Sequence, residues 1–442
     1  MSQTVEQKPL DPGSNDRGAT QRDGAPSLLE PIRQILRPIA SLRLTVVLFV
    51  LSLALVFFGT VAQKHKETFT VVDEYFYSWV VRIPFQLFAE LGKVFLGLPD
   101  TTTVSGVFPF PAGKTIGWAL FINLVAAHLV RFRFTWKRAG ILIIHAGVAV
   151  LLLGEFITRE YAVEATMSIP TGGKTNFVDV SRKVELAFVA PSEPTVEDVV
   201  VVPQSFFRKG DTVRHPELPV DVEVLDFVPN SFFEDVRAND PDGVAVSDVS
   251  GREGYVKFIP VAEESGTSTG RANAPMVRVR LKKKDSDTVL GTYTLSLWSY
   301  PNFTRRGYKF PPQTVKIDNT EYTVELRPKR VYKPYSIELK DFQVELYPGT
   351  NNPKGYASET RLEDKELGEE RDVRIWMNHP LRHRGETFYQ SSFFVRQDGT
   401  ILQVVQNPGA VLPYVSCSMI SGGMLIHFGI LLTGFLRRRA AV

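Results

Sequence analysis

Two histidines stand in segments that otherwise hold almost no polar side chains. His145 lies within AGILIIHAGVAVLLLG, and His427 lies within SGGMLIHFGILLTG. A polar side chain in such a segment normally has a partner or a function, because an unsatisfied polar group in lipid is costly. Haem iron binds imidazole as an axial ligand, and histidines on two different helices can hold a haem between them. His145 and His427 are therefore candidate axial ligands of haem iron.

The positions of these two histidines along their helices agree with that chemistry. His145 comes seven residues after Arg138, and His427 comes ten residues before Arg437. At the rise of an α-helix these separations are about 10 Å and about 15 Å, so we expect both imidazoles at similar depth. Small neighbours would leave room for a flat ligand: Ala146, Gly147, Gly422 and Gly423. The alternative is that each histidine hydrogen-bonds another helix and that the small residues allow close helix packing.

The remaining candidates give weaker signals. His128, in NLVAAHLVRF, lies close to a basic cluster, so it marks either the inner mouth of a haem path or a side chain that reaches the headgroups. We expect His65 to be solvated, and His379 and His383 to flank a strand and a turn. Cys417 is the only cysteine, which excludes a disulfide within the chain, and we expect it to be a small packing residue.

Four charge-poor stretches must position these histidines. The first runs for 20 residues without a charge, which matches the ~30 Å of a hydrocarbon core. The second is shorter and contains Asn123, but Lys114 and Arg131 at its ends can extend toward the headgroups. We therefore predict transmembrane helices at 44–63, 115–130, 139–157 and 412–436.

Lysine and arginine cluster at three places along these spans. They precede the first span, form the hairpin 131–138 between the second and third, and end the chain in the tail 437–442. With four spans all three clusters lie on one side, which the positive-inside rule makes the cytoplasm. We therefore expect a multi-pass protein of the bacterial inner membrane, with both termini cytoplasmic and residues 158–411 in the periplasm.

The segments outside the spans have distinct compositions. Residues 1–26 are polar and lack hydrophobic periodicity, which predicts a disordered cytoplasmic tail. Residues 28–43 have one apolar helical face, typical of an amphipathic helix in the headgroup layer, although they could also extend the first span. Residues 64–114 form an outer, aromatic-rich connection, which we interpret as an interfacial belt. The net charge of +3 gives no reason to expect nucleic-acid binding.

The large segment 158–411 has the pattern of β-strands. Runs such as MVRVRL and RDVRIWMN alternate with period two and are rich in β-branched residues. In SIELKDFQVEL the apolar residues change phase, which predicts a β-bulge near Lys340 or Asp341. Residues 262–275 have the composition of a flexible insertion. We thus expect four transmembrane α-helices plus a large extracytoplasmic all-β, sandwich-like domain, in which no known catalytic motif is visible.

Several segments together resemble the ResB family of the system II cytochrome c maturation apparatus. They are SLRLTVVLFVLSLALVFFGTVAQ, NLVAAHLVRFRFTWKRAGILIIHAGVAVLLLGE, YSIELKDFQVELYPGTNNPKGYASE, RIWMNHPLRHRGETFYQSSF and the last span. The resemblance implies a CcsA-type membrane partner and a joint task, which is to move haem b across the membrane and present it to apocytochrome c. It also implies intramembrane histidine ligands, here His145 and His427. Residues ~247–303 depart from the compact family pattern as an insertion, and His128 lies outside any general pattern.

The sequence therefore predicts a ResB-like subunit that binds haem in the lipid bilayer and helps to transport it. Whether the chain is itself an enzyme stays open, because the main catalytic surface for haem attachment would belong to the CcsA-type partner. Two other classes remain: a membrane b-type cytochrome that transfers electrons, and a non-catalytic assembly scaffold or receptor. Copurified haem would separate the scaffold from the other two, and loss of cytochrome c maturation on deletion would exclude simple electron transfer.

Overall fold

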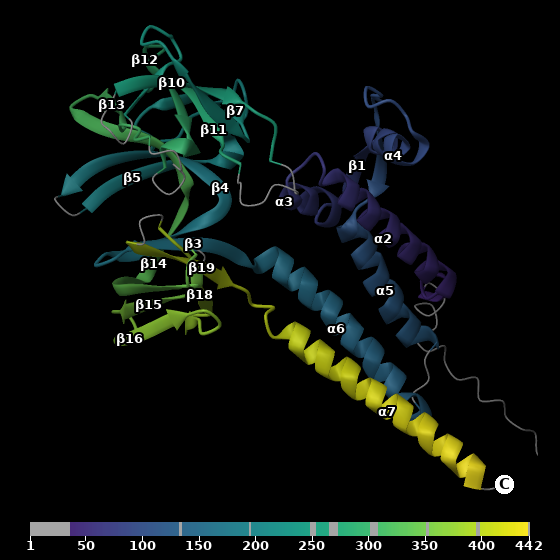
Figure 1. Cartoon of the computed structure of the whole chain (residues 1–442). Helices are drawn as coiled ribbons and strands as arrows, with labels where there is room; N and C mark the ends of the chain where they lie inside the picture. Colours follow the sequence, from purple (N-terminus) through teal and green to yellow (C-terminus); the bar gives the residue numbers. More distant parts are fainter. Residues whose placement is uncertain are drawn as a thin grey trace, which may run out of the picture.

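The computed structural model describes residues 36–131, 135–193, 196–247, 253–264, 273–300, 308–350, 353–394 and 398–440. The predicted tail 1–26 and the first part of the predicted helix 28–43 lie outside these residues, and residues 36–39 are helical. Helices gather at one end of the molecule and strands at the other (Figure 1). This arrangement confirms the predicted fold class of a helical membrane unit plus a large all-β domain of antiparallel sheets.

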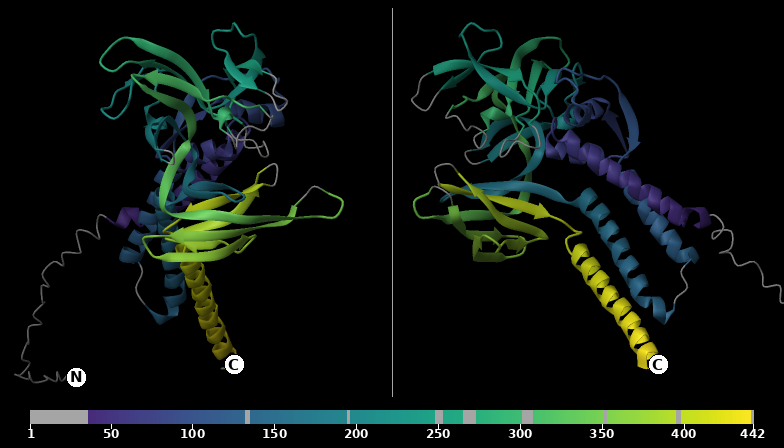
Figure 2. Two further views of the ribbon diagram at one scale, coloured as in Figure 1. Left: turned by 90° about the vertical axis from the view of Figure 1, so that its left-hand side faces the viewer. Right: turned by 45° about the vertical axis from the view of Figure 1, so that its right-hand side comes forward.

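Within the described residues, four helices are long and apolar enough to cross a membrane. They are α2 (Leu42–Ala62), α5 (Gly113–Arg131), α6 (Ala139–Tyr161) and α7 (Leu412–Ala440). These helices pack mainly in two pairs: α2 lies beside α5, and α6 lies beside α7 (Figure 2). We call the end of this unit with Arg131, Arg138 and Arg437 the basic end, and the other end the domain end.

Asn123, the polar residue within the second span, is buried and satisfied. Its side-chain oxygen accepts a hydrogen bond from the Thr45 hydroxyl at 2.7 Å. Its side-chain nitrogen donates to the carbonyl oxygens of Ile39, at 2.5 Å, and Ser41, at 3.2 Å. Asn123 therefore ties α5 to the turn that precedes α2, and the polar residue that weakens the hydropathy of α5 also fixes its position.

Three glycines, seven residues apart, hold α6 against α7. A Cβ atom at Gly140 would lie 2.6 Å from the Gly423 carbonyl oxygen, and one at Gly147 would lie 2.7 Å from a side-chain carbon of Ile420. Gly154 faces Leu412 in the same way. A seven-residue repeat keeps one face of a helix toward its neighbour, so these glycines form a continuous contact line. We call Gly140, Gly147 and Gly154 the glycine seam.

The glycine seam decides between the two interpretations of the small residues. Gly147 and Gly423 let the two backbones approach, and the Ser416 hydroxyl donates to the Gly147 carbonyl oxygen at 2.8 Å. Gly422, in contrast, has open space where a Cβ would stand. Close helix packing therefore accounts for Gly147 and Gly423, and the space there is filled by the partner helix.

The connection between α2 and α5 covers the domain end of those helices. Its apolar core includes the buried side chains of Val71, Tyr75, Ile83 and Leu87, which pack with α2 and α5. Its elements are α3 (Thr68–Val71), η1 (Val72–Phe76), β1 (Val80–Pro84), α4 (Gln86–Leu96) and β2 (Val107–Pro111). The aromatic-rich connection is thus a folded cap in which part of the aromatic set is buried.

The main sheet of the β domain is antiparallel throughout, in the order β16-β15-β14-β4-β3-β19-β18-β17. Its strands are β3 (Val163–Pro170), β4 (Lys174–Glu193), β14 (Thr320–Leu346), β15 (Pro353–Asp364), β16 (Glu369–Trp376), β17 (Leu381–His383), β18 (Glu386–Phe393) and β19 (Gly399–Gln406). Off this path, β5 (Val196–Pro203) pairs with β4, and β13 (Gln313–Ile317) pairs with β14. The predicted β-bulge is confirmed, since the register of β14 shifts between Leu339 and Asp341.

Two smaller sheets complete the domain, in the orders β12-β11-β7-β6 and β8-β10-β9. Their strands are β6 (Thr212–Val213), β7 (Asp221–Val228), β8 (Ser231–Val236), β9 (Val244–Ser247), β10 (Glu253–Pro260), β11 (Met276–Lys282) and β12 (Val289–Ser296). The region interpreted as an insertion, ~247–303, thus supplies β10, β11 and β12. Much of the predicted flexible segment 262–275 lies outside the described residues.

The long strands β4 and β14 belong to two hydrophobic cores. In β4, Val178 is buried in the core nearer the helices, whereas Leu186 is buried in the core farther from them. We call these two parts the near lobe and the far lobe. Between them, Glu185 and Arg327 form an ion pair at 3.0 Å with both side chains buried. Arg182 has a φ of 60°, in the left-handed region, where β4 bends from one lobe to the other.

The membrane helices continue directly into the near lobe. Helix α6 leads into β3, and β19 leads into α7. The strands β3 and β19 form an antiparallel ladder that begins at the helices with Val163 opposite Gln406 and ends with Pro170 opposite Gly399. Between the helices and the strands, the Thr158 hydroxyl donates to the side-chain oxygen of Asn407 at 3.2 Å. The glycine seam and the β3–β19 ladder therefore form one antiparallel unit that sets the orientation of the domain on the helices (Figure 1).

The glycine seam gives a first prediction. Replacement of Gly147 by Leu places a side chain where Ile420 now lies, so we expect a loss of about 1–3 kcal/mol in stability from overpacking. Gly422→Leu is the matched control, because open space surrounds that position. Thermal unfolding of the purified protein in detergent measures both. Equal unfolding midpoints for the two variants would contradict the seam.

Candidate functional site

The structure brings His145 together with His128 across the α5–α6 interface. Nδ1 of His145 lies 3.2 Å from Nε2 of His128, and the two rings are nearly perpendicular, at 86°. Nδ1 of His128 lies 2.8 Å from the carbonyl oxygen of Leu124, one turn earlier on α5. Both imidazoles are half-buried. A pair of histidines thus sits between α5 and α6 toward the basic end.

The same interface carries two further contacts toward the domain end. The indole of Trp118 stacks on the ring of Phe156, with centroids 4.2 Å apart and planes within 4°. Beyond them Lys114 forms an ion pair with Glu160. Since α5 and α6 are antiparallel, these pairs and the histidines occupy successive levels of one interface. We call it the α5–α6 groove: histidines toward the basic end, aromatic rings in the middle and charges at the domain end.

A cavity of about 630 Å³ opens at the domain end of the α5–α6 groove. Its walls are mostly apolar and aromatic, and include Phe76, Tyr77, Trp79, Trp118, Leu152 and Phe156. Its charged residues are Lys114, Glu155, Arg159 and Glu160. The Arg159 guanidinium lies 3.7 Å from the centre of the Tyr77 ring, and the Tyr77 hydroxyl donates to Glu155 at 3.3 Å. This size and lining suit a flat, largely apolar ligand that carries charged groups at one edge.

Sequence reasoning did not identify this cavity. The sequence predicts an interfacial belt over residues 64–114, which include Phe76, Tyr77 and Trp79, and it assigns no role to Trp118 or Phe156. A signal was present, because Lys114 and Glu160 are opposite charges near the outer ends of two successive spans. Aligning these two charges would have set the register of α5 against α6 and placed Trp118 opposite Phe156.

His427, on α7, packs against a different face of α6 from the face that carries His145. Its backbone nitrogen lies 2.6 Å from the point where a Cβ of Gly140 would stand, so it belongs to the glycine seam. Gly140 precedes His145 by five residues, which is about 140° around the helix and about 7.5 Å toward the basic end. His427 is therefore less deep than expected, and its nearest described ring neighbour is Phe428. Both histidines stay predicted ligands, and the structure pairs only His145 with another imidazole.

The other titratable candidates lie away from the α5–α6 groove. His65 is exposed, as expected, and His379 is exposed and stacks on Trp376 with ring centroids 3.8 Å apart. Cys417 is exposed on α7, so the expectation of a packing role is wrong: its side chain points away from the seam, whereas the neighbouring Ser416 contacts Gly147. Among the described residues, no group of three or more His, Cys, Asp or Glu side chains is arranged to hold a metal ion.

His383 belongs to a buried polar cluster in the near lobe. Asp364, at the end of β15, accepts hydrogen bonds from His383 at 2.8 Å and from Nε and Nη2 of Arg384 at 2.5 and 2.8 Å. The hydrogen bonds from Arg384 hold the pKa of Asp364 well below its usual range. Arg384 and Gly385, both with positive φ, form the turn between β17 and β18. The cluster therefore fastens this hairpin to β15, which is a structural role.

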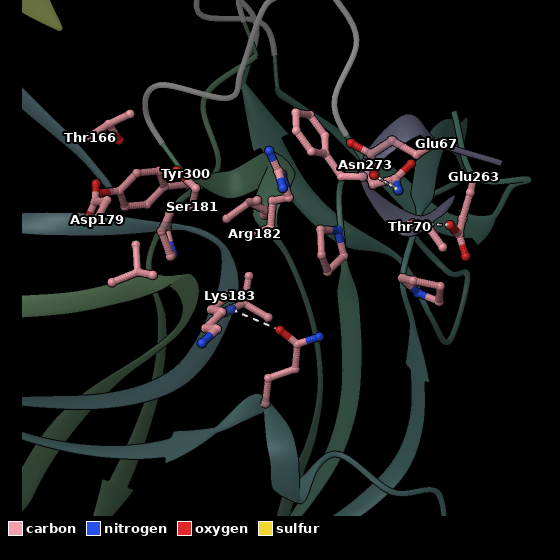
Figure 3. A pocket seen from close by; sticks show the side chains of 18 of the residues that line it. Glu67, Thr70, Thr166, Asp179, Ser181, Arg182, Lys183, Glu263, Asn273 and Tyr300 are labelled. Atoms are coloured by element: carbon pink, nitrogen blue, oxygen red, sulfur yellow. Dashed lines mark hydrogen bonds between the residues drawn. The ribbon is translucent and has the colours of Figure 1, made fainter. Parts of the chain in front are cut away.

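A second cleft, of about 640 Å³, lies where the two lobes meet α3. Figure 3 shows Arg182 in this cleft, and its guanidinium lies 3.0 Å from the centre of the Phe69 ring. The other contacts join Asn273 to Glu67 at 2.8 Å, Thr70 to Glu263 at 3.1 Å and Tyr300 to Asp179 at 2.7 Å. Burial raises the pKa of Glu67. The hydrogen bond between Tyr300 and Asp179 lies within the β domain, and the other three contacts tie the membrane unit to that domain.

Comparison with known proteins finds a match in the C-terminal part of the β domain. Residues 302–401 match the ResB-like family. The chain is also similar to Protein NrfI of Wolinella succinogenes, with 30% identity over 113 residues, which cover 26% of this chain and 12% of that protein. The chain thus spans a small part of the length of this relative. The family match covers β13 to β18 and the start of β19, and so includes the Asp364 cluster.

The Asp364 cluster predicts a pH-dependent stability. A carboxyl whose pKa is lowered by folding adds stability above its unfolded pKa, about 3.9, and loses it as the pH falls toward the lower folded value. We expect the unfolding temperature of the wild type to drop below about pH 4. Asp364→Asn should lower it at pH 7 and flatten that dependence. Glu366→Gln, at an exposed partner of Arg384, is the control and should change little. An equal acid slope in Asp364→Asn would refute the assignment.

Proposed function

Residues 302–401 are ResB-like, and from this premise we propose that the chain acts in cytochrome c biogenesis, binding haem b in the membrane and helping to deliver it for attachment to apocytochrome c. The family match supports the biogenesis role. The four long apolar helices support a site within the membrane. The matched segment ends in β19, which leads into α7, so the ResB-like residues continue directly into those helices.

The observation that carries the proposal is the α5–α6 groove. It has imidazoles toward the basic end and an aromatic-walled cavity at the domain end. Haem is a flat apolar macrocycle with an iron that binds imidazole and with carboxylates at one edge. The aromatic walls suit the macrocycle, and Lys114 and Arg159 supply cations that suit the carboxylates. We infer that the groove is the route along which this chain passes haem toward the β domain.

The proposed iron ligands are His145 and His427. His145 is supported directly, since its ring lies in the α5–α6 groove. His427 is supported less directly, because its backbone lies on the glycine seam at another face of α6. These two side chains would hold the iron through ring nitrogens, and the apolar helices around them would exclude water.

We assign the thioether bond formation mainly to a CcsA-type membrane partner. In this division the present chain supplies haem binding, and the near lobe lies where a partner or an apocytochrome would meet the delivered haem. Two other functions predict different results. A scaffold would purify without haem, and an electron-transferring b-type cytochrome would leave cytochrome c maturation intact when deleted.

Orientation is the first test. Because the basic end carries the Lys and Arg clusters, we propose that it faces the cytoplasm. Reporter fusions after Lys137 and after Arg439 should behave as cytoplasmic, and a fusion near Gly266 should behave as external. An external signal at Lys137 would overturn this orientation and the direction of transport with it.

Haem binding is the second test. The purified protein should show the low-spin reduced spectrum of haem with two imidazole ligands. His145→Gly and His427→Gly each remove one ligand, so haem content should fall and the spectrum should shift. Added imidazole should fill the space left by the missing side chain and restore the low-spin spectrum. His379→Ala, in the β domain, is the control and should bind haem normally. Wild-type haem content and spectrum in both glycine variants would remove these residues from the site.

A further inference from the structure

We propose that His128 is a positioning residue for His145: it accepts the Nδ1 hydrogen of His145 and so makes Nε2 of His145 the iron-binding nitrogen. The inference rests on the proposed function, since it concerns how a haem ligand is held. It assigns to His128 a role other than the mouth of a haem path.

The chain of hydrogen bonds begins at a backbone carbonyl. The carbonyl oxygen of Leu124 can only accept, so the Nδ1 atom of His128, 2.8 Å away, carries the hydrogen. A neutral imidazole has a single N–H and one nitrogen with a free lone pair. Nε2 of His128 is therefore an acceptor.

The second link follows from the first. Nδ1 of His145 lies 3.2 Å from that acceptor, so this nitrogen must donate. The lone pair of His145 then resides on Nε2, the nitrogen on the other side of its ring. Haem iron binds an imidazole through such an unprotonated nitrogen. The arrangement thus selects the tautomer of His145 that can bind iron.

This geometry is the one that orients ligands in metal sites. A ligating histidine commonly donates its second ring N–H to an acceptor, which fixes the ring and raises its basicity. Here the acceptor stands on α5 and the ligand on α6, with the two rings at 86°. The stacking of Trp118 on Phe156 fixes the register of the two helices and so keeps His128 opposite His145.

A matched pair of variants tests the inference. In His128→Gln the amide oxygen can take the place of Nε2 and accept from His145. In His128→Asn the side chain is one methylene shorter and cannot reach, although its polarity and the fold are kept. Haem b is titrated into each purified full-length protein, and the dissociation constant and midpoint potential are measured. We expect Gln to stay close to wild type, and Asn to bind haem about 10- to 100-fold more weakly.

The potential reports on the ring itself. Loss of the acceptor makes His145 a poorer electron donor, so the midpoint potential of His128→Asn should rise, whereas that of His128→Gln should not. Equal affinities and potentials in Asn and wild type would overturn the inference. Failure of the haem proposal is distinct: His145→Gly would then bind haem like wild type.

Discussion

The structure depends on one antiparallel unit that runs from the membrane into the β domain. Helices α6 and α7 touch along the glycine seam, and their continuations β3 and β19 form a hydrogen-bonded ladder. Because the connections are short, neither half can turn without the other. The position of every other element follows: α5 is placed against the free face of α6, and the near lobe is built outward from β3 and β19.

The β domain repeats this principle of shared elements. Strands β4 and β14 pass through both lobes, so the two lobes are joined by one continuous pair of strands. The buried pair of Glu185 and Arg327 lies between them, and each charge is costly to bury without the other. This pair fixes how the two lobes meet, and the contact of Arg182 with Phe69 fixes how β4 meets α3.

How far the sequence predicts this molecule depends on the range of the interactions. The spans are visible because each is a charge-poor run with basic residues at its predicted cytoplasmic end, and the bulge near Asp341 is visible because the apolar phase changes there. The contact of His128 with His145 is not visible, since it depends on the register between two helices. That register is set by side chains such as Trp118 and Phe156, whose pairing appears only in three dimensions. The sharing of β4 and β14 is hidden for the same reason.

The β3–β19 ladder also has a consequence for the order of folding. Strand β3 is made directly after α6, but its partner β19 is the last strand of the domain and is followed at once by α7. Pairings between such distant segments form slowly, because a long loop must close before any contact is gained. Until synthesis reaches α7, the edge of β3 lacks this partner, and an open strand edge invites pairing with other chains. The insertion of the last helix is therefore also the step that completes the domain.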